Sequence, residues 1–493
     1  MIEADATTVI SAGEPGTPRS LRDTLRRGTA WSLLGYGGVQ TLRFAGNLVL
    51  TRLLFPEAFG LMSLVNALLV GLQLVSDIGI GPSIIQSRHG AEPAFLDTAW
   101  TVRIVRGLVL WLTACAVALP FAAFYGQPAL AWILPLAGLT ALLSGVESTR
   151  LFGLYRRVDL AWVSLVEVSC QAVSVTVMIA WASRERSIAA LVAGSLAGSL
   201  TRLVLSHTVL PGHRNRLAFD RAAFGRMIRF GRWIFLSTVL TFLVSQSDRL
   251  MFGKLIPLSM LGVFGVGALI ATLPSEVLSR MATGVLFPAF SGIRNAGSDL
   301  GAVFARVRRL PLVVAAWMIA GLAGGGRVAV ELLYDERYAE AGWIVQVVAL
   351  GSWFAVLEST YGAGLLACGQ SKWTAASGAA KLAGMLCLIP LGFSVAGFFG
   401  AVVGLALSEI APYAVSARGA SGEGLKAWKQ DLALTTWMLI TAGLAGLTAA
   451  FVQPQGWPAA AAAAAVLLLV TLLWTPVALA GLRPGAADHV RRA

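Results

Sequence analysis

Apolar runs of roughly 18 to 25 residues, each followed by a short polar break, recur along this chain from residue 29 to residue 482. About 20 apolar residues in a helix span the hydrocarbon layer of a bilayer, and a helix satisfies its own backbone hydrogen bonds there. Only 13% of the 493 residues are charged, against roughly 25% in an ordinary soluble domain. Too few charged groups are present to cover a soluble fold of this length. The pattern therefore predicts an all-α integral membrane protein.

We expect about 14 transmembrane helices. The first six are predicted at residues 29–50, 59–86, 99–121, 130–149, 161–182 and 187–210. The next six are predicted at 233–252, 261–290, 310–330, 341–367, 374–393 and 395–417, and two more at 432–452 and 457–482. The second and eighth spans are long enough to contain a break. The ninth is the weakest, because glycines at 324–326 and Arg327 interrupt it.

The basic residues test this map, because loops on the cytoplasmic side of a membrane carry an excess of Lys and Arg. Alternate loops divide these residues 25 to five. The poorer side has Arg52, Arg184, Arg186, Lys254 and Arg337. This division supports the span map and predicts that both termini are cytoplasmic. The net charge of +13 is then a topology signal, and we expect no nucleic-acid partner.

A short segment at the end of the first span returns at the end of the seventh. Four pairs of matching residues share an offset of 202 positions: Arg52 with Lys254, Leu53 with Leu255, Leu54 with Ile256, and Gly60 with Gly262. Because six helices separate the two copies, both copies have the same orientation. This placement indicates a parallel repeat about an axis along the membrane normal.

The repeat and the charges together predict the domain organisation. Two six-helix bundles are expected at 29–210 and 233–417, followed by two additional helices at 432–482, with cytoplasmic tails at 1–28 and 483–493. Residues 211–232 carry six arginines among apolar residues. They predict a basic amphipathic linker on the anionic lipids of the inner leaflet, with a plain connector as the alternative.

Five segments resemble the polysaccharide transport branch of the multidrug/oligosaccharidyl-lipid/polysaccharide exporter superfamily. They are NLVLTRLLFPEAFGLMSLVNALL (47–69), SDIGIGPSIIQ (76–86), SQSDRLMFGKLIPLSMLGVFGVG (245–267), VLFPAFSGI (285–293) and RVAVELLYDERYAEAGWIVQVVALG (327–351). The resemblance implies a bacterial inner-membrane flippase, not an enzyme, that alternates access for an isoprenoid pyrophosphate-linked oligosaccharide. It also implies polysaccharide assembly machinery as a partner. It does not indicate which glycan is moved.

Such a substrate needs a polar path with cations for its pyrophosphate, and arginine forms paired, charged hydrogen bonds with phosphate. A charge near the bilayer centre costs at least ~2.5–3.5 kcal/mol, so each one needs a reason. Arg43 in the first span and Arg249 in the seventh are predicted on equivalent faces of equivalent helices, as opposite walls of one cavity. Snorkelling to the surface or a structural partner is the alternative, and for Arg249 that partner is the adjacent Asp248.

Three more residues complete the predicted substrate-binding set. Glu276 and Arg280, spaced i, i+4 after Pro274, either line the cavity or neutralise each other on one helix. Asp77 lies in a stretch rich in Gly and Pro, whose irregular backbone is tolerated where it lines a cavity.

Asp248 and Glu358 are candidates for coupling transport to proton movement, since burial brings a carboxyl group into the titrating range. A partnered structural carboxylate is the alternative for each. Charges nearer the span ends we interpret as snorkelling cations, or as solvated or paired acids: Glu147, Glu167, Lys381, Glu409, Arg103, Arg106 and Arg202. No ATP-binding motif, nucleophile–base pattern or metal-ligand spacing occurs in the sequence, so we expect no catalytic residue, metal or cofactor.

Three other functions stay open from the sequence alone. A drug/cation antiporter of the same superfamily would favour an acidic cavity, and Arg43 and Arg249 argue against it. A membrane glycosyltransferase or polymerase of the same pathway would need a large extracytoplasmic loop, whereas every predicted outer loop is short. The last alternative is a scaffold that has lost transport.

Overall fold

The computed structural model describes residues 21–77, 79–157, 159–452 and 458–482, and this part is helical without a β-strand. The predicted all-α fold class is confirmed. The predicted C-terminal tail at 483–493 and most of the predicted N-terminal tail at 1–28 lie outside the described residues.

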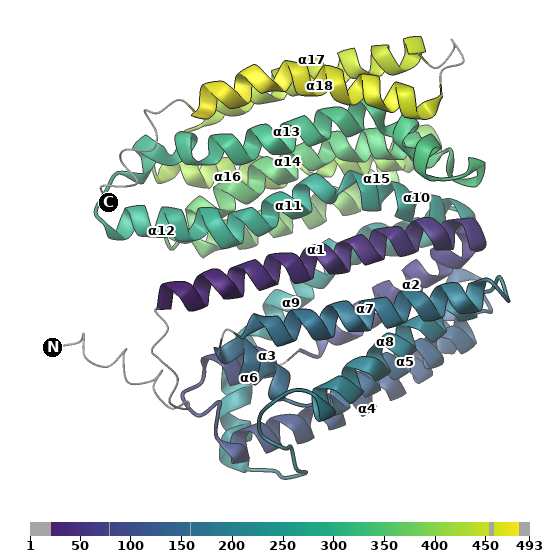
Figure 1. Ribbon diagram of the computed structural model, residues 1–493, viewed down its shortest axis with the longest axis vertical. Helices are drawn as coiled ribbons and strands as arrows, with labels where there is room; N and C mark the ends of the chain where they lie inside the picture. Colours follow the sequence, from purple (N-terminus) through teal and green to yellow (C-terminus); the bar gives the residue numbers. More distant parts are fainter. Residues whose placement is uncertain (1–20, 78, 158, 453–457, 483–493) are drawn as a thin grey trace.

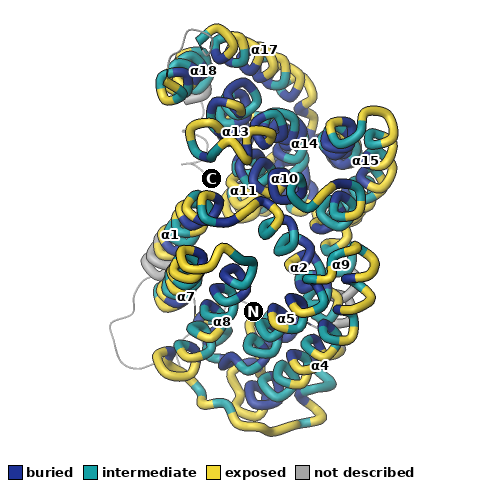
Figure 2. The backbone as a smooth tube through the Cα atoms, turned by 90° about the vertical axis from the view of Figure 1, so that its right-hand side faces the viewer, coloured by how far each residue is buried: buried dark blue, intermediate teal, exposed yellow. Residues whose placement is uncertain are grey.

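We define the N-lobe as the first eight helices. They are α1 (Leu21–Leu53), α2 (Pro56–Val75), α3 (Ile80–Gln86), α4 (Pro93–Tyr125), α5 (Leu130–Val146), α6 (Arg150–Arg157), α7 (Leu160–Ala182) and α8 (Ala189–Thr208). Within the lobe α4 packs along α5, and α7 packs along both α1 and α8. Figure 2, which looks along the helices, shows α1, α2, α5, α7 and α8 arranged around a common centre.

We define the C-lobe as the helices from α10 onwards. They are α10 (Leu258–Ala271), α11 (Leu273–Met281), α12 (Phe287–Asn295), α13 (Leu300–Leu333), α14 (Ala341–Ala367), α15 (Ser371–Ser408), α16 (Ile410–Gly422), α17 (Trp428–Val452) and α18 (Ala459–Leu482). The helix between the lobes, α9 (Arg221–Leu255), packs against α2 and against α15. The last two helices pack on α13 at one edge of the molecule (Figure 1).

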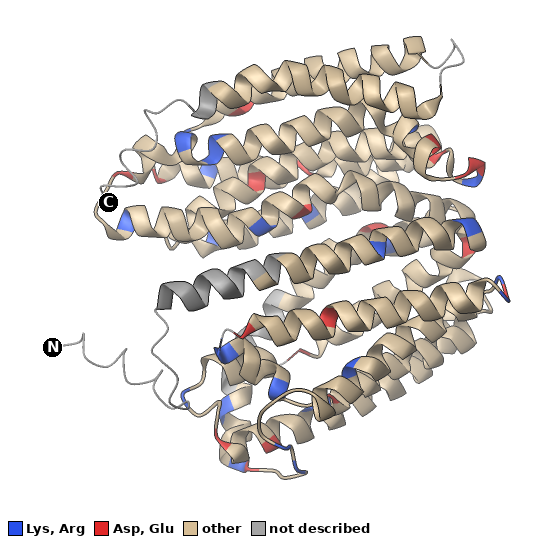
Figure 3. Ribbon diagram, in the orientation of Figure 1, with Lys and Arg blue, Asp and Glu red and all other residues tan. Residues whose placement is uncertain are grey.

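The outward surface of the helices is apolar, as a lipid-facing surface must be. Leu119, Val395 and Leu447 are among the large apolar side chains exposed there. Figure 3 shows α17 and α18 almost free of charged residues along their length, whereas charges occur within α1, α7 and α11. Of these charged residues, Arg280 on α11 lies at the junction of the two lobes, where it contacts Tyr36 of α1.

Among the described residues, nine helices are long and apolar enough to cross a membrane, or up to 11 if each of two bent pairs is one span. One of the nine, Ser371–Gly422, contains a turn at Ala396 and Gly397, where Gly397 has φ 58°. This turn falls where the eleventh and twelfth spans were predicted to meet. The total of 14 spans stays a prediction.

The two long predicted spans are both broken. The second is interrupted between Val75 and Ile80, and the eighth between Ala271 and Leu273, followed by a π-helical turn at Ala282–Leu286. The expectation of a weak ninth span was wrong, because α13 continues through the three glycines and Arg327 as one helix. These glycines let other helices approach closely: a Cβ at Gly324 would lie 2.7 Å from the carbonyl oxygen of Ala442.

The segment 211–232 differs from the predicted amphipathic helix. The chain is not helical from Pro211 to Asp220, and α9 then runs from Arg221 into the seventh predicted span without a break. The Asp220 carboxylate caps α9 by accepting hydrogen bonds from the N–H groups of Ala222 and Ala223. The linker is held on the N-lobe, because Asp97 accepts hydrogen bonds from His213 Nε2 (2.8 Å) and the backbone N–H of Arg216 (2.9 Å).

The molecule has two unlike ends (Figure 1). The arginine-poor end, as we call it, is where α1, α7, α9 and α13 finish; its loops hold the five basic residues of the poorer side. The arginine-rich end is the opposite one, where α3 and α6 lie and α13 begins. At the arginine-poor end Tyr334 Oη joins the lobes by donating to Asn47 Oδ1 (3.0 Å). Lys254 Nζ on α9 donates to the carbonyl of Phe124 in the N-lobe (2.6 Å).

The loop between α13 and α14 strengthens this closure. The Arg337 guanidinium donates to the carbonyls of Thr51 (2.8 Å) and Leu54 (3.2 Å), at the C-terminus of α1, where carbonyls lack helical partners. The same guanidinium donates hydrogen bonds to Asp335 and thereby holds the pKa of that carboxyl below its ordinary value.

Candidate functional site

A polar cavity of about 920 Å³ lies between the N-lobe and α11. It is open to the outside, and its walls come from α1, α2, α5, α7, α8 and α11. On α2 and α5 the lining residues lie in the C-terminal half of the helix, towards the arginine-rich end. On α1, α7 and α8 they lie around the middle of the helix, and Arg43, Ser174 and Ser195 lie past it towards the arginine-poor end. The cavity therefore extends from around the middle of these helices towards the arginine-rich end, opposite the end at which the lobes are joined.

One wall of the cavity is the seam between α1 and α11, where the two lobes face each other. Arg43 on α1 and Arg280 on α11 both line it. The Arg280 guanidinium carbon lies 3.4 Å from the ring centroid of Tyr36, so a cation–π contact joins the lobes here. Gln40 Nε2 donates to the Tyr36 hydroxyl (2.9 Å), which steadies the ring.

Glu276 lines the cavity with Arg280, as one of the two interpretations of this pair expected. Among the described ion pairs none joins Glu276 to Arg280 within 4 Å. The self-neutralising pair is therefore not formed in this structure, and Arg280 turns to Tyr36 instead. No hydrogen bond or ion pair is made by the Arg43 side chain within the described part of the chain.

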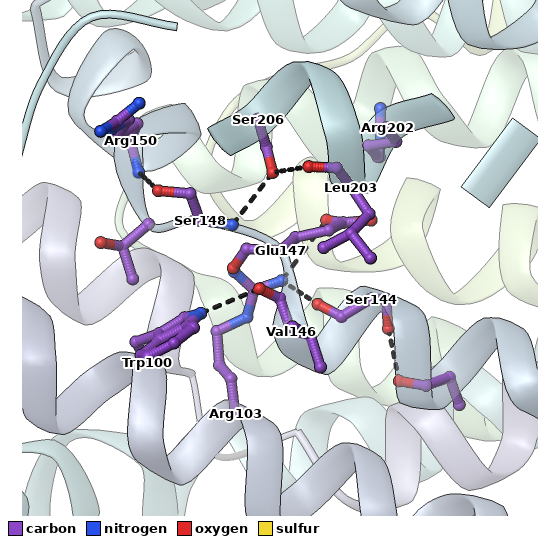
Figure 4. Close-up of polar contacts among 12 residues, drawn as sticks. Trp100, Arg103, Ser144, Val146, Glu147, Ser148, Arg150, Arg202, Leu203 and Ser206 are labelled. Atoms are coloured by element: carbon purple, nitrogen blue, oxygen red, sulfur yellow. Dashed lines mark hydrogen bonds and ion pairs between the residues drawn. The ribbon is translucent and has the colours of Figure 1, made fainter. Parts of the chain in front are cut away.

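The floor of the cavity is the break after α5, where the chain bends by 62° into α6 (Figure 4). A break inside a span leaves carbonyl groups without helical partners. Arg103 satisfies two of them, because its guanidinium donates to the carbonyls of Ser144 (2.6 Å) and Glu147 (3.1 Å). Trp100 Nε1 donates to a third, that of Val146 (2.9 Å). The backbone of Glu147 is thus fixed at the cavity floor.

The carboxylates on the N-lobe wall are paired with arginines. Glu147 Oε2 lies 3.5 Å from Arg103 Nη2, and Glu167 Oε1 lies 3.7 Å from Arg202 Nη2. The lining as a whole has three arginines and three glutamates, which balance. Two guanidiniums, those of Arg43 and Arg280, face the cavity without a carboxylate within 4 Å among the described residues.

Arg249 and Asp77 lie outside this lining. Arg249 Nη1 donates to Gln246 Oε1 on its own helix (3.0 Å). Arg280, not Arg249, joins Arg43 as a lining arginine without a carboxylate within 4 Å among the described residues. Asp77 sits at the break between α2 and α3, where its Oδ1 accepts a hydrogen bond from Gly79 N–H (2.9 Å). Gly79 has φ 67°, a conformation that favours glycine, and the carboxylate holds this turn.

Asp248 on α9 and Glu358 on α14 belong to a separate polar cluster between α9 and the C-lobe, which we call the C-lobe cluster. Glu358 Oε1 accepts hydrogen bonds from Ser377 (3.1 Å) and Ser416 (3.0 Å). Asp248 Oδ1 is inaccessible to solvent and has no hydrogen-bond partner within the described residues. Lys381 lies in electrostatic range of both carboxylates and pairs with Glu409 at 2.6 Å.

Three charged lining residues were not singled out from the sequence as binding residues: Glu147, Glu167 and Arg202. They had been assigned to span ends, where a charge usually reaches water or a local partner. Their pairing was anticipated for the acids, but their place in a cavity was not. The signal that could have identified these three residues is the series of hydroxyl and amide residues on the same helices. Such side chains are costly on a lipid-facing surface, so their presence indicates a polar cavity.

Fold and site together define a polytopic helical membrane protein whose two lobes enclose a polar cavity at their junction. The model of the polysaccharide biosynthesis protein family matches residues 49–342, more than half of the chain. The chain belongs to this family, which confirms the resemblance found in the sequence.

Two relatives cover most of the chain. The succinoglycan biosynthesis transport protein ExoT of Rhizobium meliloti (strain 1021) is 22% identical over 345 residues, 70% of this chain and 69% of the relative. The lipopolysaccharide biosynthesis protein WzxC of Escherichia coli (strain K12) is 21% identical over 394 residues, 79% of this chain and 80% of the relative.

Solved structures share the fold. The lipid II flippase MurJ in an inward closed conformation matches with a TM-score of 0.70 at 11% identity, over 94% of this chain and 100% of that one. A multidrug resistance transporter of the MATE family in an inward-facing conformation matches with a TM-score of 0.57 at 13% identity, over 80% of this chain and 96% of that one. At these identities the likeness concerns the fold alone.

Proposed function

We propose that this protein is a flippase or exporter that moves a lipid-linked oligosaccharide across the bacterial inner membrane. The observation that carries the proposal is the polar cavity with two unpaired guanidiniums, Arg43 and Arg280, on facing lobes of a membrane-spanning fold. A cavity of this kind serves the polar head of a lipid whose tail stays in the bilayer. The names of the relatives, which concern polysaccharide transport and biosynthesis, agree with it.

Arg43 and Arg280 receive the pyrophosphate of the substrate in this proposal. Guanidinium groups bind phosphate oxygens through paired, charged hydrogen bonds. These hydrogen bonds are stronger inside a low-dielectric site than in water. The two arginines come from different lobes, so a bound pyrophosphate bridges them. Arg249 was predicted from the sequence for the same role. We do not assign it that role here, because its guanidinium bonds to Gln246 and lies outside the cavity lining.

Movement by alternating access agrees with the two unlike ends. The cavity extends from around the middle of the helices towards the arginine-rich end. At the other end, hydrogen bonds of Arg337 and Tyr334 join the lobes, and Lys254 joins α9 to the N-lobe. By the positive-inside rule the arginine-rich end is cytoplasmic, and so are both termini. The cavity then faces the cytoplasm, where the lipid-linked oligosaccharide is made, and anionic lipids of the inner leaflet gather around the basic loops.

Asp248 and Glu358 are the coupling residues in this proposal. They share the C-lobe cluster with Lys381 and Glu409, which are the other charged groups facing them from α15 and the junction of α15 with α16. Asp248 immediately precedes Arg249 on α9, the helix that packs against both lobes. A proton taken up or released in the cluster would bias the position of α9 and so the relative position of the lobes.

The proposal is tested in a deletion strain that has no second exporter for the same glycan. Surface polysaccharide and lipid-linked oligosaccharide on the cytoplasmic face are measured after complementation with the wild type, Arg43→Ala, Arg280→Ala or Arg52→Ala. Arg52 is the matched control, because it lies on α1 with an exposed side chain outside the cavity.

We expect the deletion to lose surface glycan and to accumulate the lipid-linked intermediate inside. The wild type and Arg52→Ala restore export, whereas Arg43→Ala and Arg280→Ala do not. Normal glycan and normal intermediates in the deletion strain would contradict the proposal and point to small-molecule efflux. Full rescue by both cavity variants would contradict the role of the two arginines.

A further inference from the structure

The charges of the cavity limit which anions it accepts. Of the three arginines that line it, Arg202 is already paired with Glu167. Two arginines close behind the wall are also committed. Arg103 is bonded to the floor at Ser144 and Glu147, and Arg106 donates to Ser76 Oγ (3.0 Å) and to the carbonyl of Gln73 (2.6 Å). Arg43 and Arg280 are therefore the two lining cations available to a ligand among the described residues.

A pyrophosphate linkage uses both of them. Two negatively charged phosphates meet two guanidiniums at the seam of α1 and α11, and each pair forms charged hydrogen bonds. Four lining charges remain after this match: Glu147, which pairs with Arg103, the pair of Glu167 and Arg202, and Glu276, which has no ion pair within 4 Å among the described residues. Within the described part of the chain, no unpaired lining cation is left for a second anionic group of the same ligand.

The rest of the wall is uncharged and rich in hydrogen-bonding groups. Amide and hydroxyl side chains line it from α1, α2, α5, α7 and α8: Gln40, Gln73, Thr140, Ser144, Gln171, Ser174, Ser195 and Ser199. Amides and hydroxyls both donate and accept, as the hydroxyl groups of a sugar do. Carboxylates such as Glu276 accept hydrogen bonds from sugar hydroxyls as well.

The size of the cavity limits how many sugars of the ligand contact its wall. Its volume of about 920 Å³ lies near the upper end of the range for small-molecule sites, about 300–1,000 Å³. It fits the pyrophosphate and the sugars next to it, while the remainder of a long oligosaccharide extends through the open side. The cavity wall can therefore discriminate between substrates only by the sugars nearest the lipid.

We propose that this cavity accepts lipid-linked oligosaccharides whose sugars nearest the pyrophosphate are uncharged, and disfavours a uronic acid at these positions. The inference rests on the proposed function and names its substrate class. A uronate in the cavity meets the carboxylates of Glu147, Glu167 and Glu276. To pair with Arg202 it has to displace Glu167, which leaves that carboxylate unpaired beside the incoming one.

The test uses the full-length protein in liposomes and two synthetic probes. Both are isoprenoid pyrophosphates with the same disaccharide, except that the first sugar is glucose in one and glucuronic acid in the other. Movement across the bilayer is followed by oxidation of newly exposed sugar with an impermeant reagent. We expect the uronic acid probe to move roughly tenfold more slowly or worse, because like charges in a confined site repel strongly.

Two variants separate the charge effect from general damage. Glu167→Gln removes the ion pair of Arg202 and frees its guanidinium. We expect it to reduce the ratio of the transport rates of the two probes by at least about threefold. Glu185→Gln makes the same chemical change in an exposed loop outside the cavity and is expected to leave the difference unchanged. Equal movement of both probes by the wild type, or faster movement of the acidic one, overturns the inference while the proposed function stands. If neither probe moves, the proposed function fails and the inference with it.

Discussion

Gly60 and Gly262 occupy equivalent positions of the internal repeat, and each packs against the backbone of the other copy. A Cβ at Gly60 would lie 2.1 Å from the carbonyl oxygen of Leu258, and a Cβ at Gly262 would lie 2.0 Å from that of Pro56. The two contacts are related by the same offset of 202 residues, since 56 pairs with 258 as 60 pairs with 262. The N-termini of α2 and α10 therefore meet across a local two-fold relation at the arginine-poor end.

Alanine at either glycine should force these two helices apart, because a backbone carbonyl cannot move aside as a flexible side chain can. We expect Gly60→Ala and Gly262→Ala each to lower stability by about 1–3 kcal/mol. Hydrogen exchange at residues 54–62 and 255–263 should rise at the same time. Thermal unfolding in detergent and exchange mass spectrometry measure the two effects.

Gly265→Ala is the control for this pair, because a Cβ at Gly265 on α10 has no neighbour within 4 Å. It should leave exchange unchanged and stability equal or slightly higher, since alanine favours a helix over glycine. Similar behaviour of all three variants would show that the close approach of α2 and α10 does not hold this end together.

The pH dependence of this end should come in part from Asp335. Its pKa is lowered by hydrogen bonds from Arg337, so the folded state favours the carboxylate more than the unfolded chain does. The stabilisation is then present above the ordinary pKa of 3.8 and is lost as the pH falls through the lower value of the folded state. Because both side chains are about one third exposed, the effect is small.

We expect Asp335→Asn to have a lower thermal midpoint than the wild type at neutral pH, with the gap closing below about pH 4. Glu336→Gln, a neighbouring exposed acid without a described ion pair, should follow the wild type over the whole range. The test is to measure the thermal unfolding midpoint of each variant from pH 3 to pH 8 in the same detergent, at about one measurement per pH unit. If the difference in thermal midpoint between Asp335→Asn and the wild type stays constant with pH, the loss of stability does not come from the charge of Asp335.

The sequence singled out the cavity-lining residues that can be recognised by depth alone. Arg43, Glu276 and Arg280 stand out because a charge well inside an apolar span is costly without a purpose. Glu147 was placed at a span end, and its position at a cavity floor depends on the break after Val146, which is set by contacts with Arg103 and Trp100. Those contacts join residues more than 40 positions apart and leave no local pattern.

The position of Arg249 illustrates a second limit. The repeat correctly relates the ends of the first and seventh spans, as the contact of Gly60 and Gly262 shows. Equivalent positions on two helices do not determine how far each helix is rotated towards a shared cavity. Here the packing of α9 against α2 and α15 leaves Arg249 beside Gln246, while Arg280, beyond the break of the eighth span, reaches Tyr36.

A fully buried ion pair joins α17, in the last helix pair, to the rest of the C-lobe. Arg308 Nη2 on α13 lies 2.8 Å from Asp431 Oδ1 on α17, and Tyr361 Oη donates to Asp431 Oδ2 (2.6 Å). Removing one member should leave an uncompensated buried charge, so Arg308→Met and Asp431→Leu should each lower stability by about 3–5 kcal/mol. The double variant should recover much of this loss, because no charge then remains buried.

Unfolding free energies of the two single variants and the double variant form the cycle that measures this coupling. Arg306→Met, an exposed arginine on the same helix, controls for loss of an arginine and should change stability little. Additive losses in the double variant would contradict the pairing. Retained export by a stable double variant would show that the pair anchors α17 without acting on the substrate.

The ring of Tyr36 should matter more for transport than its hydroxyl. The ring lies 3.4 Å from the Arg280 guanidinium carbon and holds that side chain at the seam between the lobes. A cation–π contact contributes about 0.5–2 kcal/mol, which corresponds to roughly a 2- to 30-fold change in apparent affinity. We therefore expect Tyr36→Leu to raise KM for a lipid-linked oligosaccharide in liposomes by this factor, with a smaller change in kcat.

Tyr36→Phe keeps the ring and loses the hydrogen bond from Gln40, so it should stay close to the wild type. The comparison separates two roles that a single substitution would merge. If Phe and Leu impair transport equally, the hydroxyl acts on the substrate directly. If both variants behave as the wild type does, Arg280 needs no positioning by α1, and the bridge between the lobes at this seam forms only when the pyrophosphate is bound.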